Sequence, residues 1–248
     1  MGVPWFKIQK EAKQYGIVAF SSNYALYADM SNRVVEVLGQ FTPNLEVYSI
    51  DESFLDLSGF NRDLVEYGQE IRQRVQQWLG LAVCVGIAPS KTLAKLANHC
   101  AKKGLAGSAG ACDFTTMTES QLTELFAGID VGEVWGVGRK IEARLADMGI
   151  TTVLQLREAD PDLIRSKFSV VLEKTVRELR GVSCLDLEEV APDKQQIMCS
   201  RSFGQYVYDR DQLEEVVASY VARAAEKLRM QASLAGALMV FIRTNPFS

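Results

Sequence analysis

Residues 48–57 read Tyr48-Ser49-Ile50-Asp51-Glu52-Ser53-Phe54-Leu55-Asp56-Leu57, and this stretch decides the fold of the first part of the chain. Apolar residues such as Ile50 and Phe54 suit a half-buried pleated surface, whereas the adjacent acids Asp51 and Glu52 do not. Because neighbouring side chains on a regular strand point to opposite faces, the two acids can share one site only at a bend or a hairpin tip. The stretch therefore predicts two short strands joined by an acidic turn.

The two adjacent carboxylates require an explanation of their own. Without a cation, two carboxylates roughly 4 Å apart repel each other by about 1 kcal/mol even in bulk water. A divalent metal turns this repulsion into a binding site, so one hypothesis is a Mg²⁺ cluster that supports phosphoryl transfer. The alternative is a solvated turn that happens to carry two acids, and an isolated Asp-Glu pair favours that alternative. The choice between them depends on the rest of the chain.

Length and composition describe a globular protein of more than one domain. The chain has 248 residues, of which 48% are hydrophobic and 23% are charged, and its length predicts two or three small domains. The sequence shows neither an apolar run that could span a bilayer nor the pattern of a secretion signal, so we expect a cytoplasmic protein without membrane contact. The five cysteines include no Cys-x-x-Cys pair and His99 is the single histidine, which argues against a zinc site. The net charge of −4 does not by itself indicate a nucleic-acid partner.

Helix and strand patterns alternate through the first 103 residues. We expect helices at 4–15, 22–38, 62–79 and 90–103, and strands at 17–20, 45–50, 53–57 and 81–87. This order predicts a sheet that carries helices on one face. Residues 113–181 predict short helices alone, at 140–148, 152–158, 161–167 and 170–180, with Thr118 and Gln121 as a capping box. An acidic linker then leads to a strand at 196–204, a helix at about 210–230 and a strand at 236–243, which together predict part of a small α/β unit.

The expected helix at 90–103 presents a row of positive charge. Lys91, Lys95 and Lys102 fall within roughly 40° of one another on a helix that turns by about 100° per residue, and residues 86–103 contain no acid. An acidic turn that faces a lysine row is a way to bind a metal ion and a triphosphate together. The alternative is a lysine face that only contacts solvent, which is the usual role of such a run.

A second motif, Val134-Trp135-Gly136-Val137-Gly138-Arg139-Lys140, places two glycines around one apolar residue between expected helices. Glycine permits a tight turn that exposes backbone N–H groups at a helix N-terminus, where a phosphate can bind. Arg139, Lys140 and Arg144 add positive charge beside this turn. The alternative is a plain turn between two helices, but the motif is similar to the helix-hairpin-helix of DNA repair proteins. A contact of this kind would be to the DNA backbone and would carry no sequence information.

Taken in order, these motifs resemble those of one enzyme family. Tyr48-Ser49-Ile50-Asp51-Glu52, then Gly86-Ile87-Ala88-Pro89-Ser90-Lys91-Thr92-Leu93-Ala94-Lys95-Leu96-Ala97, then the glycine motif, are similar in order and spacing to the Y-family translesion DNA polymerases, and most similar to their UmuC-like members. The resemblance implies an α/β fold class: an α+β palm with an antiparallel-type sheet and helices on one face, an all-helical thumb with a helix-hairpin-helix, and a partial α/β little finger. The implied domains are a remnant of the fingers at 1–22, an incomplete palm at 23–112, a thumb at 113–181, a linker at 182–195 and a partial little finger at 196–248.

The resemblance also implies a role for each matching residue. Asp51 and Glu52 match the catalytic acids that hold Mg²⁺. Lys102, and less directly Lys91 and Lys95, match lysines that contact the triphosphate of the incoming nucleotide. The DNA-binding positions of the thumb and the little finger are matched by Gly136, Gly138, Arg139, Lys140 and Arg201. The implied reaction adds a dNTP to a primer 3′ end by two-metal phosphoryl transfer, in SOS mutagenesis and DNA repair.

Several family features have no match in the sequence, so the chain resembles a fragment truncated at both ends. They are the first palm strand, with Asp-x-Asn-x-Phe and the third metal-binding acid, the fingers segment with the Tyr and Arg that hold the triphosphate, and the rest of the little finger with the clamp-binding tail. The resemblance therefore implies a catalytically incomplete chain, with primer–template DNA, dNTPs, the processed UmuD dimer, the recombinase filament and the sliding clamp as partners of the family. Two alternatives stay open: a non-catalytic DNA-binding fragment that uses the glycine motif, and a palm-type nucleotidyl cyclase, which does not account for that motif.

Overall fold

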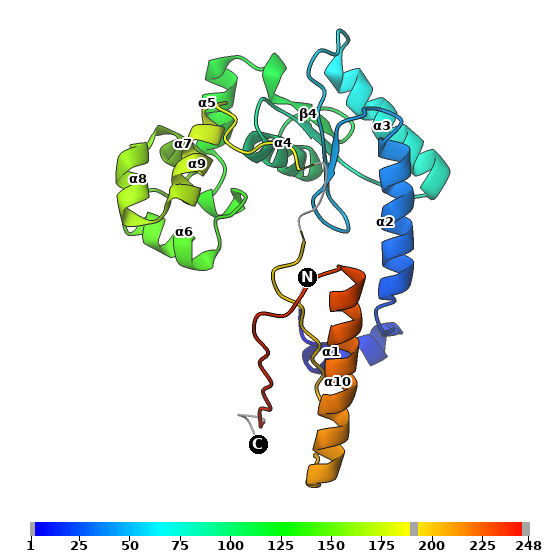
Figure 1. Cartoon of the computed structure of the whole chain (residues 1–248). Coiled ribbons are helices and arrows are strands. Elements are labelled where there is room, and N and C mark those ends of the chain that lie inside the picture. The colour runs from blue at the N-terminus through cyan, green and yellow to red at the C-terminus, as the bar shows by residue number, and fades with distance from the viewer. Residues whose placement is uncertain (1–2, 189–192, 245–248) are drawn as a thin grey trace. The chain divides into compact units, whose positions relative to one another are not determined.

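The chain folds into two compact units, Met1–Glu189 and Val190–Ser248, in a computed structural model that describes residues 3–188 and 193–244 (Figure 1). Helices α1–α9 and strands β1–β4 belong to the first unit, and helix α10 belongs to the second. Within the described ranges, all buried apolar side chains lie in the first unit. The hydrophobic core of the described chain is therefore that of the first unit.

Two helices precede the first strand. α1 (Trp5–Tyr15) ends at Gly16, whose φ of 67° is the left-handed conformation that glycine adopts most easily at a helix C-terminus. α2 (Tyr24–Leu38) begins after Asn23, whose side chain accepts a hydrogen bond from the Leu26 N–H at 3.1 Å. The two helices expected from the sequence in this region are confirmed.

The strand expected at 17–20 is not present. Ile17, Val18 and Phe20 are 53%, 68% and 88% exposed, and the segment pairs with no strand in the described part of the chain. A strand is stabilised by hydrogen bonds to a neighbour and by the burial of one face. This segment has neither, so the expectation was wrong.

The acidic turn is the tip of a β-hairpin. β1 (Leu45–Val47) pairs antiparallel with β2 (Ser53–Leu55), in the register that sets Glu46 opposite Phe54. The strands are shorter than expected because the N–H groups of Tyr48 and Ser49 both donate to the Glu52 carbonyl, which closes the turn. The prediction of a hairpin with both acids at its tip is confirmed.

The next four elements are α3 (Leu64–Leu79), β3 (Val85–Ile87), α4 (Lys91–Lys103) and β4 (Ala111–Asp113). β4 pairs parallel with β3 and is not among the expected strands, although Ala111 and Cys112 are fully buried. The expectation of an antiparallel-type sheet is therefore only partly correct. The described strands form one antiparallel pair and one parallel pair.

α4 packs very closely on β3 at Gly86. A Cβ atom at this position would overlap the backbone of Ala94 and Asn98, so only glycine fits. The Asn98 side chain also donates a hydrogen bond to the Cys84 carbonyl at 2.8 Å. These contacts fix the lysine-bearing helix against the strand beside it.

Short helices fill the rest of the first unit (Figure 1). They are α5 (Glu119–Ala127), α6 (Arg139–Ala146), α7 (Val153–Glu158), α8 (Pro161–Lys167) and α9 (Val170–Leu179), with 3-10 turns at Phe114–Thr116 and Val131–Glu133. The capping box of Thr118 and Gln121 is present, as expected. Buried Phe126 and Leu145 of this region share one hydrophobic core with Leu96 of α4. Packing is thus continuous across the boundary expected at 112–113, and the domain ranges within this unit stay a prediction.

The second unit is built on α10 (Arg210–Met230), as the sequence predicts. The strands expected at 196–204 and 236–243 are not present, since neither segment has a strand partner within residues 193–244. Leu238 and Met239 are 72% and 83% exposed, so burial does not support a strand there either. For the described residues, the prediction of strands in an α/β little finger is therefore wrong. Part of the expected linker at 182–195 lies outside the described residues.

Candidate metal and nucleotide site

The two acids at the hairpin tip are exposed, so their oxygens are accessible to a cation. The Asp51 carboxylate accepts a hydrogen bond from the Ser49 hydroxyl at 2.8 Å, which orients it locally. Carboxylate oxygens are the ligands that Mg²⁺ prefers in proteins. The tip therefore offers two suitable ligand groups that are adjacent in the chain.

Lys95 is the lysine of α4 that reaches the acidic tip. Its Nζ donates to the Glu52 carboxylate. The same ammonium group lies 5.4 Å from the centre of the Tyr48 ring and 5.9 Å from the centre of the Trp135 ring. Both distances are within the range of a cation–π contact. The structure thus brings Glu52 and Lys95 together, as a facing acidic turn and lysine row require.

Lys91 has different partners. Its Nζ donates to the Glu46 carboxylate on β1 and, at 2.6 Å, to the Asp186 carbonyl. The side chains of Lys91 and Glu46 are only 11% and 8% exposed, and Glu46 also accepts the Glu188 N–H at 2.8 Å. This lysine is therefore used in a buried ion pair that fastens residues 186–188 to β1. Its expected contact with a triphosphate stays a prediction.

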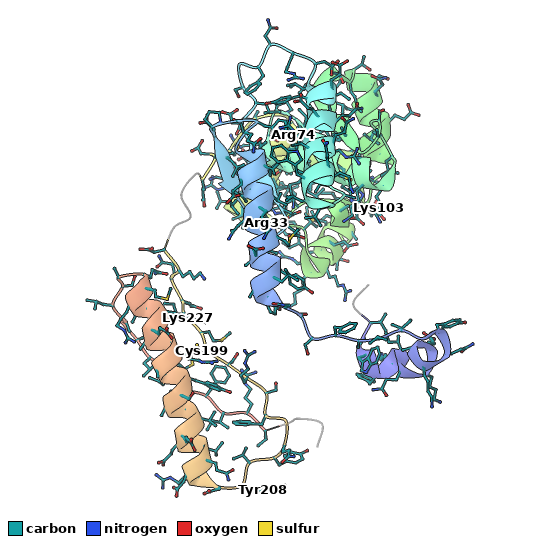
Figure 2. The ribbon with its side chains drawn as sticks, turned by 90° about the vertical axis from the view of Figure 1, so that its right-hand side faces the viewer. Arg33, Arg74, Lys103, Cys199, Tyr208 and Lys227 are labelled. Atoms are coloured by element: carbon teal, nitrogen blue, oxygen red, sulfur yellow. The ribbon has the colours of Figure 1, made fainter. Side chains whose placement is uncertain are left out.

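Lys102 lies in the last turn of α4 and is exposed. It is seven residues beyond Lys95, which is about 10 Å along a helix axis. In the described ranges it forms no ion pair with a carboxylate, and neither does the neighbouring Lys103, which is labelled in Figure 2. Sequence periodicity puts Lys95 and Lys102 on one helix face, but the structure brings only Lys95 to Glu52. The assignment of Lys102 to the triphosphate stays a prediction.

The glycine motif forms a tight turn that leads into α6. Gly136 has a φ of 88°, a left-handed conformation that favours glycine, and Gly138 is the N-cap of the helix. Arg139 and Lys140 are exposed in the first turn of α6, where the first N–H groups of any helix lack an intrahelical acceptor. The element before the turn is the 3-10 turn Val131–Glu133 and not an α-helix. A helix-hairpin-helix that binds a phosphate therefore stays a prediction.

Trp135 joins the glycine motif to the acidic hairpin. Its indole N–H donates to the Tyr48 hydroxyl at 3.0 Å, and its ring packs edge to face on the Tyr48 ring at 5.2 Å. Its ring also lies 5.7 Å from that of Phe54 on β2. The two motifs that the sequence marks separately are thus in direct contact. The only sign of this contact in the sequence is that each motif contains an aromatic residue, Tyr48 in one and Trp135 in the other.

Glu178 on α9 is a second residue whose role sequence reasoning missed. Its side chain is fully buried and accepts the N–H groups of Thr92 at 2.8 Å and Cys184 at 2.9 Å. The Ser90 hydroxyl donates to its backbone carbonyl at 2.8 Å. A carboxylate at the first turn of a helix offsets the positive end of the helix dipole. Glu178 therefore fixes the start of α4 to α9.

The two acids of the tip fit a magnesium ion only as part of a larger ligand set. Within residues 3–188 and 193–244, no group of three or more His, Cys, Asp or Glu side chains is arranged to hold a metal ion. Mg²⁺ is, however, commonly bound by one or two carboxylates together with water and substrate phosphates. Asp51 and Glu52 satisfy that requirement.

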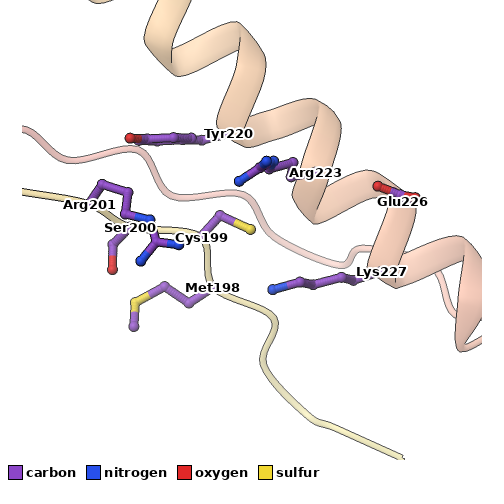
Figure 3. Close-up of a pocket in the computed structure, with 8 residues that line it drawn as sticks. All are labelled: Met198, Cys199, Ser200, Arg201, Tyr220, Arg223, Glu226 and Lys227. Carbon is purple, nitrogen blue, oxygen red and sulfur yellow. The ribbon is translucent and has the colours of Figure 1, made fainter. Parts of the chain in front are cut away.

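Arg201 lies in the second unit, beside α10. It lines an open hollow of about 350 Å³ together with Arg223 and Lys227 of the helix. Figure 3 shows the three basic side chains around this space, with Glu226 and Tyr220 on the same helix. Positive charge gathers here, which is compatible with an anionic partner. The DNA-binding role of Arg201 stays a prediction.

In the described parts of the chain, helices of membrane-spanning length and apolarity are not found.

Two models of one protein family match the sequence. Residues 1–99 match the impB/mucB/samB family, and residues 194–248 match the C-terminal domain of the same family. Together these two ranges make up more than half of the chain.

Curated relatives match along all or most of the chain. It is 50% identical to the protein UmuC of Salmonella typhimurium and 47% identical to the protein MucB of Escherichia coli, in each case over 100% of this chain. It is 24% identical to a DNA polymerase IV of Clostridium acetobutylicum over 93% of this chain and 57% of that relative. The chain spans 58% of the length of UmuC and 59% of that of MucB.

Solved structures share the fold. A Y-family DNA polymerase chimera of Dbh and Dpo4 aligns with a TM-score of 0.68 at 20% identity, over 91% of this chain and 64% of that chain. The insertion ternary complex of Dbh DNA polymerase aligns with a TM-score of 0.56 at 22% identity, over 72% of this chain and 51% of that chain. The chain belongs to the impB/mucB/samB family and has the fold of Y-family DNA polymerases.

Proposed function

We propose that the chain is part of a DNA-directed DNA polymerase of the translesion type, a nucleotidyltransferase that adds dNTPs to a primer 3′ end in SOS mutagenesis and DNA repair. The observation that carries this proposal is the hairpin tip with Asp51 and Glu52 against the lysine-bearing face of α4. The identity to UmuC and the similarity to a DNA polymerase IV support the same reaction class.

In the proposed site, Asp51 and Glu52 hold Mg²⁺ together with the nucleotide phosphates. The bound metal would supply charge stabilisation for the attacking and leaving oxygens of the phosphoryl transfer. Lys102 contacts the triphosphate from the exposed end of α4, whereas Lys91 stabilises the same helix through its buried ion pair. Within the described residues Lys102 is exposed and forms no ion pair, so its ammonium group can form a charge-assisted hydrogen bond with an incoming phosphate.

The proposed DNA contacts lie in both units. Gly136 and Gly138, with Arg139 and Lys140, contact the phosphate backbone of primer–template DNA from the glycine turn. Arg201 adds a contact from the second unit. By similarity to UmuC, the further proposed partners are the processed UmuD dimer, the recombinase filament and the sliding clamp, and the proposed location is the cytoplasm.

Template-directed binding of a nucleotide tests this function. The chain is mixed with primer–template DNA, Mg²⁺ and one labelled dNTP at a time, and the retained label is measured. The proposal predicts that the dNTP complementary to the first unpaired template base is retained best and that chelation of Mg²⁺ removes the preference. Equal retention of all four dNTPs, with and without Mg²⁺, would contradict it.

One observation favours a second candidate, a non-catalytic DNA-binding fragment. Among the described residues, no third His, Cys, Asp or Glu side chain joins the two acids at the tip in a group that could hold a metal ion, and Glu52 is already paired with Lys95. Such a fragment would bind duplex DNA with an affinity that falls steeply as salt rises, and it would not retain dNTPs. The nucleotide-retention assay therefore separates the two candidates.

A further inference from the structure

One lysine lies at the centre of the contacts that surround the acidic tip. The ammonium group of Lys95 touches the Glu52 carboxylate and lies close to the faces of the Tyr48 and Trp135 rings. The Lys95 side chain is 22% exposed, and that of Glu52 is 44% exposed. The cation is therefore more shielded from water than the acid that it neutralises.

An ammonium group and a divalent metal ion compete for the same carboxylate oxygens. While Lys95 is paired with Glu52, the net charge available to attract a metal ion at the tip is reduced. The aromatic faces of Tyr48 and Trp135 attract an ammonium group without using the acid. They give the Lys95 cation a favourable position that remains when another cation takes Glu52.

We propose that Lys95 is a resident counter-ion of Glu52 that competes with the metal ion, and that Tyr48 and Trp135 hold its ammonium group when the metal binds. The inference rests on the proposed use of Asp51 and Glu52 as metal ligands. It makes Lys95 a positioning residue at the metal-binding acid, which is a different role from the triphosphate contact implied by the resemblance. Lys95 keeps Glu52 paired in the metal-free chain and lowers the affinity of the tip for metal.

The test measures the affinity of the whole chain for Mn²⁺ from the electron paramagnetic resonance signal of the free ion. Lys95→Met removes the competing charge but keeps an apolar side chain, so it should tighten Mn²⁺ binding roughly two- to five-fold, the size expected from loss of an exposed ion pair. Lys95→Arg keeps the charge and should bind Mn²⁺ like the wild type. Lys103→Met makes the same change in net charge at an exposed position of α4 (Figure 2) and should have little effect.

Unchanged or weaker Mn²⁺ binding by Lys95→Met overturns the inference, and so does an equal gain in Lys103→Met. Glu52→Gln separates this outcome from failure of the proposed function. If Glu52→Gln lowers Mn²⁺ affinity but Lys95→Met does not raise it, the proposed metal site stands and the role of Lys95 is refuted. If Glu52→Gln leaves Mn²⁺ affinity unchanged, the proposed metal site is refuted, and the role of Lys95 with it.

Trp135 gives a second readout that does not depend on affinity. In a chain with Trp5→Phe and Trp78→Phe, emission comes from Trp135 alone. Mg²⁺ should change this emission because the nearby ammonium group shifts relative to the indole ring. The same substitutions combined with Lys95→Met should abolish the change. If Lys95→Met lowers stability, Lys95→Gln replaces it in the comparison. In either case, an identical emission response to Mg²⁺ with and without the Lys95 substitution overturns the inference.

Discussion

The indole N–H of Trp135 donates to the hydroxyl of Tyr48 at 3.0 Å, and this bond joins the glycine turn to the acidic hairpin. The two rings meet edge to face at 5.2 Å, and Phe54 on the adjacent strand lies 5.7 Å from the indole. Edge-to-face pairs of this kind add about 0.5–1.5 kcal/mol beyond the burial of their surface. The conformation of the hairpin tip is therefore coupled to the position of the glycine turn.

Loss of the Trp135 ring should loosen the hairpin tip. In Trp135→Ala, the amides of Tyr48 and Ser49, which donate to the Glu52 carbonyl, should exchange with solvent up to about ten-fold faster. Trp135→Phe keeps the ring contact and loses only the hydrogen bond, so its effect should be smaller. Hydrogen exchange measured by NMR provides the test, with Trp78→Ala on α3 as the control. Unchanged exchange in Trp135→Ala would show that the ring does not support the tip.

Removal of one partner of the Glu46–Lys91 pair should destabilise the first unit strongly. Both side chains are nearly buried, so Lys91→Met leaves the Glu46 charge unpaired and should lower the free energy of unfolding by about 3–5 kcal/mol. The double substitution Glu46→Gln with Lys91→Met should cost less than the sum of the two single changes. Urea denaturation measures all three. The exposed pair Asp29–Arg33 is a control in which Arg33→Met should cost about 1 kcal/mol or less. Strict additivity at Glu46 and Lys91 would contradict a coupled buried pair.

Glu178 should matter for stability as much as any apolar core residue. Glu178→Ala deprives the N–H groups of buried Thr92 and half-buried Cys184 of their acceptor, at a cost of about 1–3 kcal/mol for each group. Glu124→Ala removes an exposed acid from α5 and should change stability by about 0.5 kcal/mol or less. Thermal unfolding monitored by circular dichroism compares the two variants. Similar melting temperatures for both would refute the role of Glu178 at the start of α4.

Because of two buried thiols, we expect the free energy of unfolding to fall in alkaline solution. Burial raises the pKa of Cys100 from 9.0 to about 12 and that of Cys112 from 9.0 to about 11. Above pH 9 the unfolded chain loses these protons while the folded chain retains them. The free energy of unfolding should therefore fall between about pH 9 and pH 11, by up to about 1.4 kcal/mol per pH unit for each thiol.

Cysteine variants measure this alkaline slope directly. The double variant Cys100→Ala with Cys112→Ala should be less stable at neutral pH because it leaves cavities, but its stability should decline less steeply with pH. Cys84→Ala, at a half-buried position, should retain the wild-type slope. Stability curves in urea at several pH values give the comparison. Equal slopes in the wild type and the double variant would show that other groups control the alkaline transition.

Sequence patterns predicted the helices and the hairpin tip, because residues near one another in the chain determine them. The helices followed from their caps, such as Asn23 and the pair Thr118–Gln121. The hairpin tip followed from two adjacent acids that a regular strand cannot place on one face. The strands expected at 17–20, 196–204 and 236–243 failed because a strand depends on a partner that local propensity does not supply. β4 was missed for the converse reason, since three residues beside β3 form a strand where propensity gives little sign of one.

The sequence predicted that Asp51 and Glu52 lie together at the hairpin tip, but it did not predict which lysine of α4 reaches them. Helical periodicity puts Lys95 and Lys102 on one face, but the height of each along α4 relative to the hairpin depends on tertiary packing, including the close contact at Gly86. Trp135 meets Tyr48 from 87 positions away in the sequence. Contacts at such separations leave no periodic trace in a single sequence.

The Mg²⁺ dependence of dNTP affinity tests the acidic tip most directly. The dissociation constant for a dNTP is measured by equilibrium dialysis, with and without Mg²⁺, for the wild type, Asp51→Asn, Glu52→Gln and the exposed control Glu124→Gln. A metal–nucleotide site at the tip predicts that Mg²⁺ tightens binding in the wild type and in Glu124→Gln, and that both substitutions at the tip remove this gain. An equal gain from Mg²⁺ in all four chains would contradict the assignment of Asp51 and Glu52.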